Sequence, residues 1–337
     1  MKPIYLVIIF TVFIIVLFLL KKENFRVSND VIDYLAKSEV EGQENVPDIF
    51  AMKSDILCVR IDKNGTISAL RKPDNGRSDT VIKYIEKTLK KYPGYNIQGV
   101  FCIGLQDAYD NAPPGVMVFS KKTGSPGVLI PDLYAMDNYT GDLEEKDEIP
   151  FEEKKDLGLF IGASTGLTNP LVNERLRACK VSKEYPEHLE SYLTGICQMK
   201  EEDVAKYYPD YKSYLHHGMN KQEQYKYRYL INIDGNTCAW NRLPWVMNSN
   251  SVVIRVMSSN LCWYYPILNH INPYITCSTP EELPKAIEIA RQMTPEEVKL
   301  MQKAGKRFVE DYLNPDVQMR YFADVLKAKS NKGNLSK

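Results

Sequence analysis

The spacing of hydrophobic and polar positions divides the chain into a series of strands and helices. Residues 55–71 alternate hydrophobic and polar positions around Asn64-Gly65, which predicts a β-hairpin. Residues 79–91 repeat hydrophobic positions at helical spacing and predict an amphipathic helix. The same criteria predict further strands at 97–105, 116–120, 157–164, 227–233, 251–257 and 273–277, and helices from Pro170, within 201–225, and at 240–247, 263–268, 280–292, 294–312 and 315–329. Strand–loop–helix units in both halves therefore predict an α/β protein with two Rossmann-like domains that face a cleft.

The N-terminal residues 4–20 contain no charged residue, glycine or proline. As a helix they would extend about 26 Å, at the short end of a membrane span. A cleaved signal peptide is the alternative, but its apolar region is shorter and ends in small residues, whereas Lys21 and Lys22 follow here. We therefore expect a single-pass membrane anchor over residues 1–22. Positive charges on its two sides nearly balance, which leaves the orientation open: lumenal ER or Golgi in a eukaryotic host, the cytoplasmic face otherwise.

Composition divides the rest of the chain into two regions. Residues 23–50 are polar and aperiodic and are predicted to be a stem. Residues 51–150 and 151–330 are predicted to be the two α/β domains, and 331–337 a tail. The acidic, turn-rich segment 137–156 is expected to be a solvent-exposed surface loop near the domain boundary.

Charge and cysteine content exclude some classes of function. The 337 residues include 43 Lys plus Arg and 43 Asp plus Glu, so no net positive charge favours nucleic acid, and no nucleic-acid partner is expected. The seven cysteines form no CxxC motif and have no histidine at ligand spacing. We expect no metal site and expect buried, unpaired cysteines, while the redox compartment stays open.

Two glycine-containing turns follow predicted strands. Residues 162–166 combine Gly, Ser and Thr, whose N–H and hydroxyl groups can bind phosphate oxygens, and Arg175 follows in the next helix. Residues 234–242 include Trp240 and Arg242, which offer a flat apolar surface and a partner for a diphosphate. A structural turn, a solvated arginine and a core tryptophan remain the alternatives.

The first turn also has the spacing of a hydrolase nucleophile motif. Ser164 is the serine of a GxSxG sequence, and Asp234 and His270 follow in the chain order of α/β-hydrolases. Against this, Pro170 places the helix start several residues after the turn. The pattern therefore favours a phosphate-binding turn.

Several of these segments resemble glycosyltransferase family 90. The resemblance is strong over 225–259 and 263–275, and residues 160–177 and 303–313 are similar to an upstream arginine-bearing segment and to the family's usual ending. The family includes protein O-glucosyltransferases of the Rumi type, fungal capsule-associated proteins and lipopolysaccharide-modifying transferases. The motif residues of this sequence most resemble those of the last group. The resemblance covers about 100–330. Ile161, Asn241 and Asn260 depart from its usual pattern.

The resemblance implies a GT-B-like fold and an inverting transfer of a hexose or pentose from a UDP-sugar to a glycan, lipid-linked glycan or protein hydroxyl. It implies no cofactor and no metal, an acceptor-side domain at 51–150 and a nucleotide-sugar-binding domain at 151–330. Asp107 falls at the catalytic position, where a carboxylate takes the acceptor proton, with Asp110 as its rival. The implied donor-binding residues, including those that shape the turns, are Gly162, Ser164, Thr165, Arg175, Asp234, Gly235, Trp240 and Arg242. A catalytically silent glycan-binding or scaffold protein that keeps the fold is the alternative.

Overall fold

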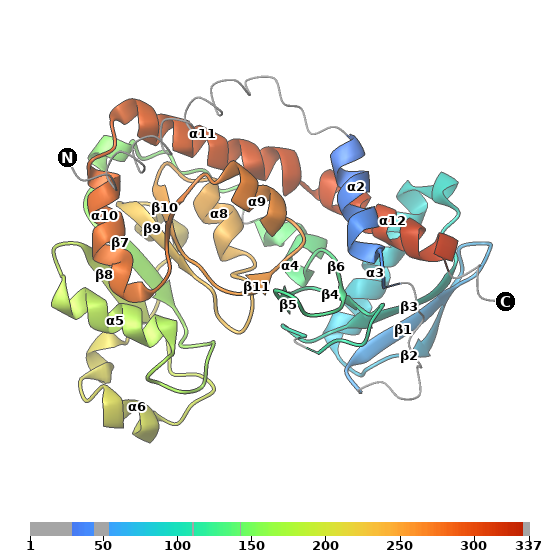
Figure 1. Cartoon of the computed structure of the whole chain (residues 1–337), viewed down its shortest axis with the longest axis horizontal. Coiled ribbons are helices and arrows are strands. Elements are labelled where there is room, and N and C mark those ends of the chain that lie inside the picture. The colour runs from blue at the N-terminus through green and yellow to red at the C-terminus, as the bar shows by residue number, and fades with distance from the viewer. Residues whose placement is uncertain (1–28, 44–53, 110, 142, 333–337) are drawn as a thin grey trace.

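The computed structural model describes residues 29–43, 54–109, 111–141 and 143–332. These residues form two halves, each with a five-stranded sheet (Figure 1). In these ranges no helix is long and apolar enough to cross a membrane. The predicted anchor at 4–20 and the predicted tail from 333 onward lie outside the described residues. The α/β class expected from the sequence is confirmed.

The sheet of the N-terminal half is mixed. Its order is β2-β1-β3-β4-β6, in which β1 pairs antiparallel with β2 and β3, while β3, β4 and β6 are parallel. The predicted hairpin forms because Gly65 adopts a φ of 79°, a conformation that glycine tolerates well. This sheet differs from an all-parallel Rossmann sheet, because the hairpin and the β1–β3 pairing place antiparallel strands at its start. The bounds are Ile56–Ile61 (β1), Ile67–Arg71 (β2), Gly99–Gly104 (β3), Met117–Val118 (β4) and Val128–Leu129 (β6).

The sheet of the C-terminal half is parallel throughout, with the order β12-β10-β9-β7-β8. Numbered along the chain, its strands lie in the spatial order 2-1-3-4-5, a doubly wound arrangement in which ligands bind at the carboxyl ends of the strands flanking the switch point. Here that point lies between β7 and β9. The bounds are Lys155–Gly162 (β7), Leu189–Leu193 (β8), Tyr227–Ile233 (β9), Val252–Val256 (β10) and Ile275–Cys277 (β12).

Both faces of this parallel sheet are buried. Along β9, Leu230 belongs to one hydrophobic cluster and Ile231 to another, and Val253 and Ile254 of β10 divide in the same way. Since successive strand residues point to opposite faces, helices must cover both sides of the sheet. The α-helices of the described residues are Asn29–Val40 (α2), Gly76–Lys91 (α3), Leu133–Met136 (α4), Glu174–Glu184 (α5), Glu201–Tyr207 (α6), Lys221–Gln224 (α7), Arg242–Met247 (α8), Tyr265–Ile271 (α9), Leu283–Arg291 (α10), Pro295–Tyr312 (α11) and Pro315–Lys332 (α12).

The two halves share one hydrophobic cluster, which runs from α2 to α12. After α11, the chain returns to the N-terminal half, where α12 packs beside α2 and α3 (Figure 1). Trp263 of the C-terminal half stacks on Tyr321 of α12, with ring centroids 4.4 Å apart. A short antiparallel pair, β5 (Lys121–Lys122) with β11 (Asn260–Leu261), also joins the halves.

The predicted stem contains a packed helix. Ile32, Ala36 and Val40 of α2 are buried against the core, so residues 29–40 of the predicted stem pack on the folded domain. The end of α2 is also fixed by polar contacts: Glu39 accepts a hydrogen bond from the Lys121 ammonium at 3.1 Å. Ile32, Ala36 and Val40 recur at helical spacing, so the signal for this helix was present in a segment that is otherwise polar.

The acidic segment 137–156 is not wholly solvated. Asp147 and Lys154 form an ion pair at 2.7 Å, and both side chains are fully buried. The carboxylate also accepts a hydrogen bond from the Asn250 amide nitrogen, and the ammonium donates to the Tyr225 carbonyl. Such a pair keeps two buried charges satisfied, so it fixes this segment to the C-terminal half.

Candidate functional site

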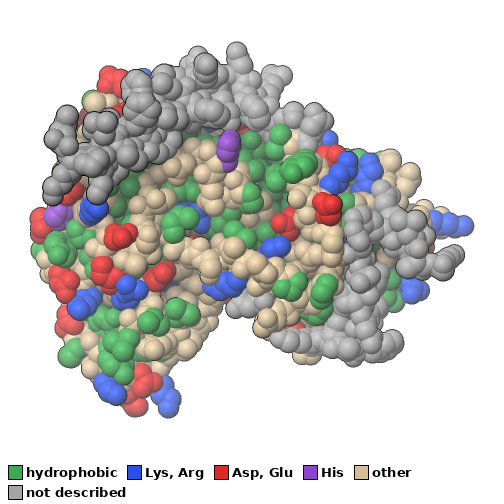
Figure 2. All heavy atoms as spheres, in the orientation of Figure 1, with side chains coloured by type: hydrophobic (Ala, Val, Ile, Leu, Met, Phe, Trp, Pro, Cys, Tyr) green, Lys and Arg blue, Asp and Glu red, His purple; other side chains and the backbone are tan. Residues whose placement is uncertain are grey.

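A cavity of about 520 Å³ is lined by residues of both halves. In the space-filling view a notch separates the halves at the lower edge (Figure 2). The loops after β7 and β9 form one wall of the cavity, as the switch point of the parallel sheet leads one to expect. The loop after β3 and helix α4 contribute from the N-terminal half. Of the residues predicted to act, the cavity brings together Asp107, Gly162, Thr165, Arg175, Gly235, Trp240 and Arg242.

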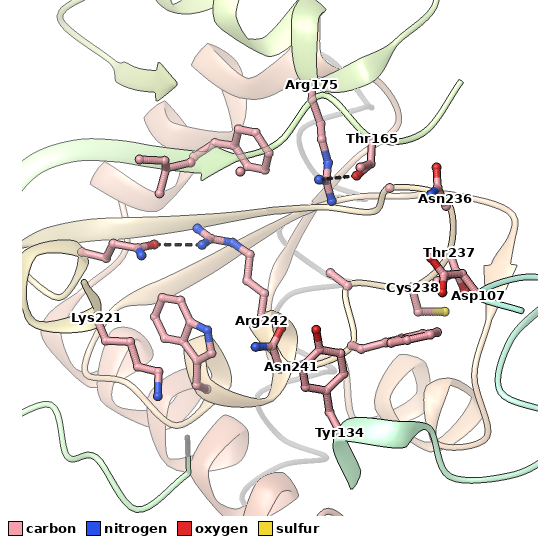
Figure 3. A pocket seen from close by; sticks show the side chains of 18 of the residues that line it. Asp107, Tyr134, Thr165, Arg175, Lys221, Asn236, Thr237, Cys238, Asn241 and Arg242 are labelled. Carbon is pink, nitrogen blue, oxygen red and sulfur yellow. Dashed lines mark hydrogen bonds between the residues drawn. The ribbon is translucent and has the colours of Figure 1, made fainter. Parts of the chain in front are cut away.

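Arg175 joins the two loops at the switch point. Its guanidinium donates hydrogen bonds to the carbonyl oxygens of Ala163 and Ile233, both at 2.9 Å. It also donates to the Thr165 hydroxyl at 2.8 Å (Figure 3). Arg175 therefore fixes the ends of β7 and β9 relative to each other while it lines the cavity.

Arg242 extends the positive charge along the same wall. Its guanidinium donates to the Ile231 carbonyl and, at 2.8 Å, to the Gln224 side-chain oxygen. The guanidinium carbons of Arg175 and Arg242 lie 5.6 and 5.7 Å from the centre of the same Phe160 ring. Among the described residues, neither arginine forms an ion pair with a carboxylate.

Burial lowers the pKa of Arg175 to about 10. Burial and, second, the charge of Arg175 lower the pKa of Arg242 to about 9. Both directions indicate positive charge that the protein itself does not fully compensate. An anionic group bound between the two guanidiniums would supply the missing compensation.

Gly235 allows the two loops to approach closely. A Cβ atom at this position would lie 2.6 Å from the Thr165 hydroxyl oxygen and 2.9 Å from an Arg175 nitrogen. The neighbouring Asn236 side chain accepts a hydrogen bond from the Gly166 N–H at 2.9 Å and so ties the loops together. Only a residue without a side chain fits here without moving the arginine.

Ser164 and Asp234 do not line the cavity. Ser164 is fully buried, and its hydroxyl oxygen accepts a hydrogen bond from the Cys197 N–H at 2.8 Å. The buried Asp234 carboxylate accepts from the Ala239 N–H at 3.0 Å and from the Ser258 hydroxyl at 2.6 Å. These two side chains lie inside the fold and stabilise the two loops there instead of facing the cavity. The burial of Ser164 also leaves no accessible nucleophile for the hydrolase alternative.

Trp240 lies between the halves. Its indole contacts Phe119 and Tyr134 of the N-terminal half edge-on, at centroid distances of 6.2 and 5.8 Å. Its side chain lines the cavity although the residue is only 9% exposed. Because Tyr134 lines the same cavity from α4, these two rings form an aromatic wall where the halves meet.

Asp107 reaches the cavity from the N-terminal half, at the end opposite Lys221 (Figure 3). One carboxylate oxygen, Oδ1, accepts a hydrogen bond from the Arg77 guanidinium at 2.8 Å. Arg77 also donates to the Leu105 carbonyl at 2.6 Å, so it holds the carboxylate against the end of β3. Among the described residues no side chain bonds to Oδ2. Asp110, the rival candidate, lies outside them.

A close contact shapes the loop that carries Asp107. The Tyr109 ring lies over Gly104, where a Cβ atom would come within 2.5 Å of the ring. The Tyr109 N–H also donates to the Ser120 carbonyl at 3.3 Å. The chain therefore turns back directly after β3, and the turn presents Asp107 to the cavity.

Sequence reasoning missed several cavity residues, of which Arg77 is the most informative. The helix predicted at 79–91 begins at Gly76, because the Asn75 side chain caps it by accepting the Ser78 N–H. The Asn75-Gly76 pair was the available signal for this earlier start. Other missed residues that line the cavity are Tyr134, Lys221, Gln224, Asn236 and Thr237.

In the described ranges no three or more His, Cys, Asp or Glu side chains are grouped to bind a metal ion. The charge at the cavity wall comes from Arg175 and Arg242, which are ligands for anions.

Comparison with known proteins identifies the family. The sequence model described as glycosyl transferase family 90 matches residues 120–333. The chain is also similar to protein O-glucosyltransferase 3 of Homo sapiens and of Mus musculus, 29% identical in each case over 157 residues. These alignments cover 46% of this chain and 29% of each relative, so they span less than a third of the relatives' length. The family match includes both arginine-bearing loops and begins after Asp107. Since it covers most of the sequence, this chain belongs to glycosyl transferase family 90.

Proposed function

We propose that this protein is an inverting glycosyltransferase that transfers a hexose or pentose from a UDP-sugar to a hydroxyl of a glycan, a lipid-linked glycan or a protein. The observation that carries the proposal is the pair of partly buried arginines, Arg175 and Arg242, which share the Phe160 ring and have no carboxylate partner among the described residues. A diphosphate is the anion that two adjacent guanidiniums and the neighbouring loop amides would bind. Family membership supports glycosyl transfer.

In the proposed reaction the acceptor hydroxyl oxygen attacks the anomeric carbon of the sugar. The bond from that carbon to the β-phosphate oxygen breaks, and UDP leaves with the electron pair. Asp107 takes the proton of the hydroxyl, since its Oδ2 is available while Arg77 holds Oδ1. Arg175 and Arg242 stabilise the negative charge that develops on the diphosphate.

The arrangement of the halves supports a GT-B-like fold in which one half binds the donor and the other half faces the acceptor. The parallel sheet supplies the loops proposed to bind the donor, and the mixed sheet supplies Asp107 and Tyr134. An acceptor would then approach from the N-terminal side, next to the aromatic wall of Tyr134 and Trp240. Aromatic faces are suitable surfaces for the apolar side of a sugar ring.

The test is a UDP-release assay over a panel of UDP-sugars and acceptors, with Asp107→Asn as the variant. We expect turnover to fall at least ~100-fold, the lower end for loss of a general base. UDP affinity should stay near the unmodified value, because the proposed diphosphate contacts lie in the other half.

Asp110→Asn is the matched control and should change turnover little. If Asp110→Asn abolished turnover and Asp107→Asn did not, the base would be Asp110. Absence of turnover and of donor hydrolysis with every UDP-sugar would favour the catalytically silent alternative.

A further inference from the structure

Two cysteines of the N-terminal sheet lie directly opposite each other. Cys58 of β1 pairs with Cys102 of β3 in the antiparallel register. Directly opposed residues of antiparallel strands have Cα atoms about 4.5 or 5.5 Å apart, and a disulfide spans Cα separations of about 4.4–6.8 Å. The backbone therefore needs no rearrangement for these two side chains to be joined.

The side chains point toward each other inside the core. The two sulfur atoms lie 2.7 Å apart, and the residues are 0% and 2% exposed. This separation is closer to a covalent bond than to an ordinary contact between two thiols. The contact between the two sulfurs lowers the pKa of Cys58 and raises the pKa of Cys102, so the two thiols interact directly.

We propose that Cys58 and Cys102 form a disulfide bond that crosslinks β1 and β3 when the chain folds with a disulfide oxidant. In this reaction the thiolate of one of the two cysteines attacks a disulfide such as oxidised glutathione and releases one glutathione thiol. The thiolate of the other cysteine then attacks the mixed disulfide and releases the second glutathione thiol. The protein loses two electrons and two protons, and one oxidised glutathione becomes two reduced molecules.

The location of the pair gives the crosslink a structural role. Both sulfurs are enclosed by the core, so the bond must form before or while the strands pack, and the folded sheet then shields it from reductants. Cys102 lies on the strand whose end leads to Asp107, so the bond would fix that strand to β1. This inference does not depend on the proposed transferase activity.

The test uses the full-length chain refolded in a glutathione buffer that contains the oxidised form. Free thiols are labelled with N-ethylmaleimide in denaturant without reductant, and tryptic peptides are identified by mass. We expect peptides 54–60 and 92–121 to appear as one linked species, two hydrogen masses below their sum, which separates after dithiothreitol. Cys197, in peptide 184–200, is the internal control and should carry the label. Complete labelling of both Cys58 and Cys102 would overturn the proposal.

Cys58→Ala and Cys102→Ala provide a second measurement. In each variant the remaining cysteine of the pair should become labelled. Dithiothreitol should lower the Tm of the unmodified oxidised chain more than the Tm of either variant, and an equal decrease would contradict the crosslink. The peptide analysis needs no variant, so it decides the question even where a variant fails to fold.

Discussion

Replacing Gly235 with alanine tests the geometry of the proposed diphosphate site with one methyl group. The added Cβ would lie 2.6 Å from the Thr165 hydroxyl oxygen and 2.9 Å from an Arg175 nitrogen. Both distances are too short for non-bonded atoms, so Thr165 and Arg175 must move. The backbone at Gly235 is not in the left-handed region, so the effect comes from this contact alone.

The size of the effect follows from the interactions that the methyl group displaces. Thr165 and Arg175 are joined by a hydrogen bond of 2.8 Å. A hydrogen bond to a charged group contributes about 1.5–3 kcal/mol. If displacement of the guanidinium removes one such bond to the diphosphate, the Kd for UDP should rise roughly 10- to 150-fold, since about 1.4 kcal/mol corresponds to a factor of ten.

Isothermal titration calorimetry with UDP measures this change, and a thermal melt confirms that the variant is folded. Gly162→Ala is the matched control, because its Cβ would lie 3.4 Å from the Phe160 ring and 3.5 Å from the other terminal nitrogen of Arg175, which are ordinary contacts. Gly162→Ala should bind UDP nearly as well as the unmodified chain. The reasoning is refuted if Gly235→Ala keeps full affinity, or if both variants lose affinity equally.

Three further predictions concern stability and metal dependence. Burial raises the pKa of Asp132 to about 6, so the folded state binds a proton more tightly than the unfolded chain and stability falls as pH rises from about 4 to 6. Asp132→Asn keeps the helix-capping oxygen and should remove this decrease, which is about 2 kcal/mol between pH 4.5 and 7 in urea unfolding. Parallel pH profiles for the two proteins would contradict it. A chain that begins at Asn45 should have a lower melting temperature than one that begins at Asn29. The shorter chain loses the burial of Ile32 and Val40, which contributes about 3–6 kcal/mol of apolar stabilisation. Equal melting temperatures would show that α2 is dispensable. Turnover should persist in EDTA, because arginines are proposed to neutralise the diphosphate; loss of turnover that manganese restores would argue for a metal.

The sequence predicts best those features that depend on neighbouring residues. The hairpin at Asn64-Gly65 and the capped helix α11 follow from local turn and capping chemistry, and the structure contains both. The loops at 162–166 and 234–242 could be identified because a buried strand precedes each one. Their meeting at one cavity follows from the parallel order of the strands.

The features that the sequence did not predict depend on contacts between distant segments. Periodicity does not encode strand direction, so the antiparallel pairing of β1 and β3 was missed. The ion pair of Arg77 with Asp107 joins residues 30 positions apart, and no local pattern marks it. Ser164 has a hydroxyl that could bind a phosphate, but the hydrogen bond from the Cys197 N–H holds this hydroxyl inside the fold.

The return of α12 to the N-terminal half reverses the order in which the two halves can be completed during synthesis. Residues 54–141 leave the ribosome first, yet the helix that packs on α2, α3 and β3 is the last element made. The Ser330 hydroxyl, near the end of α12, donates to the Gln98 carbonyl just before β3 at 2.7 Å. Domains of a growing chain usually fold from the N-terminus onward. Here the parallel sheet can close while the mixed sheet still lacks its covering helix, so the half that is translated first is finished last.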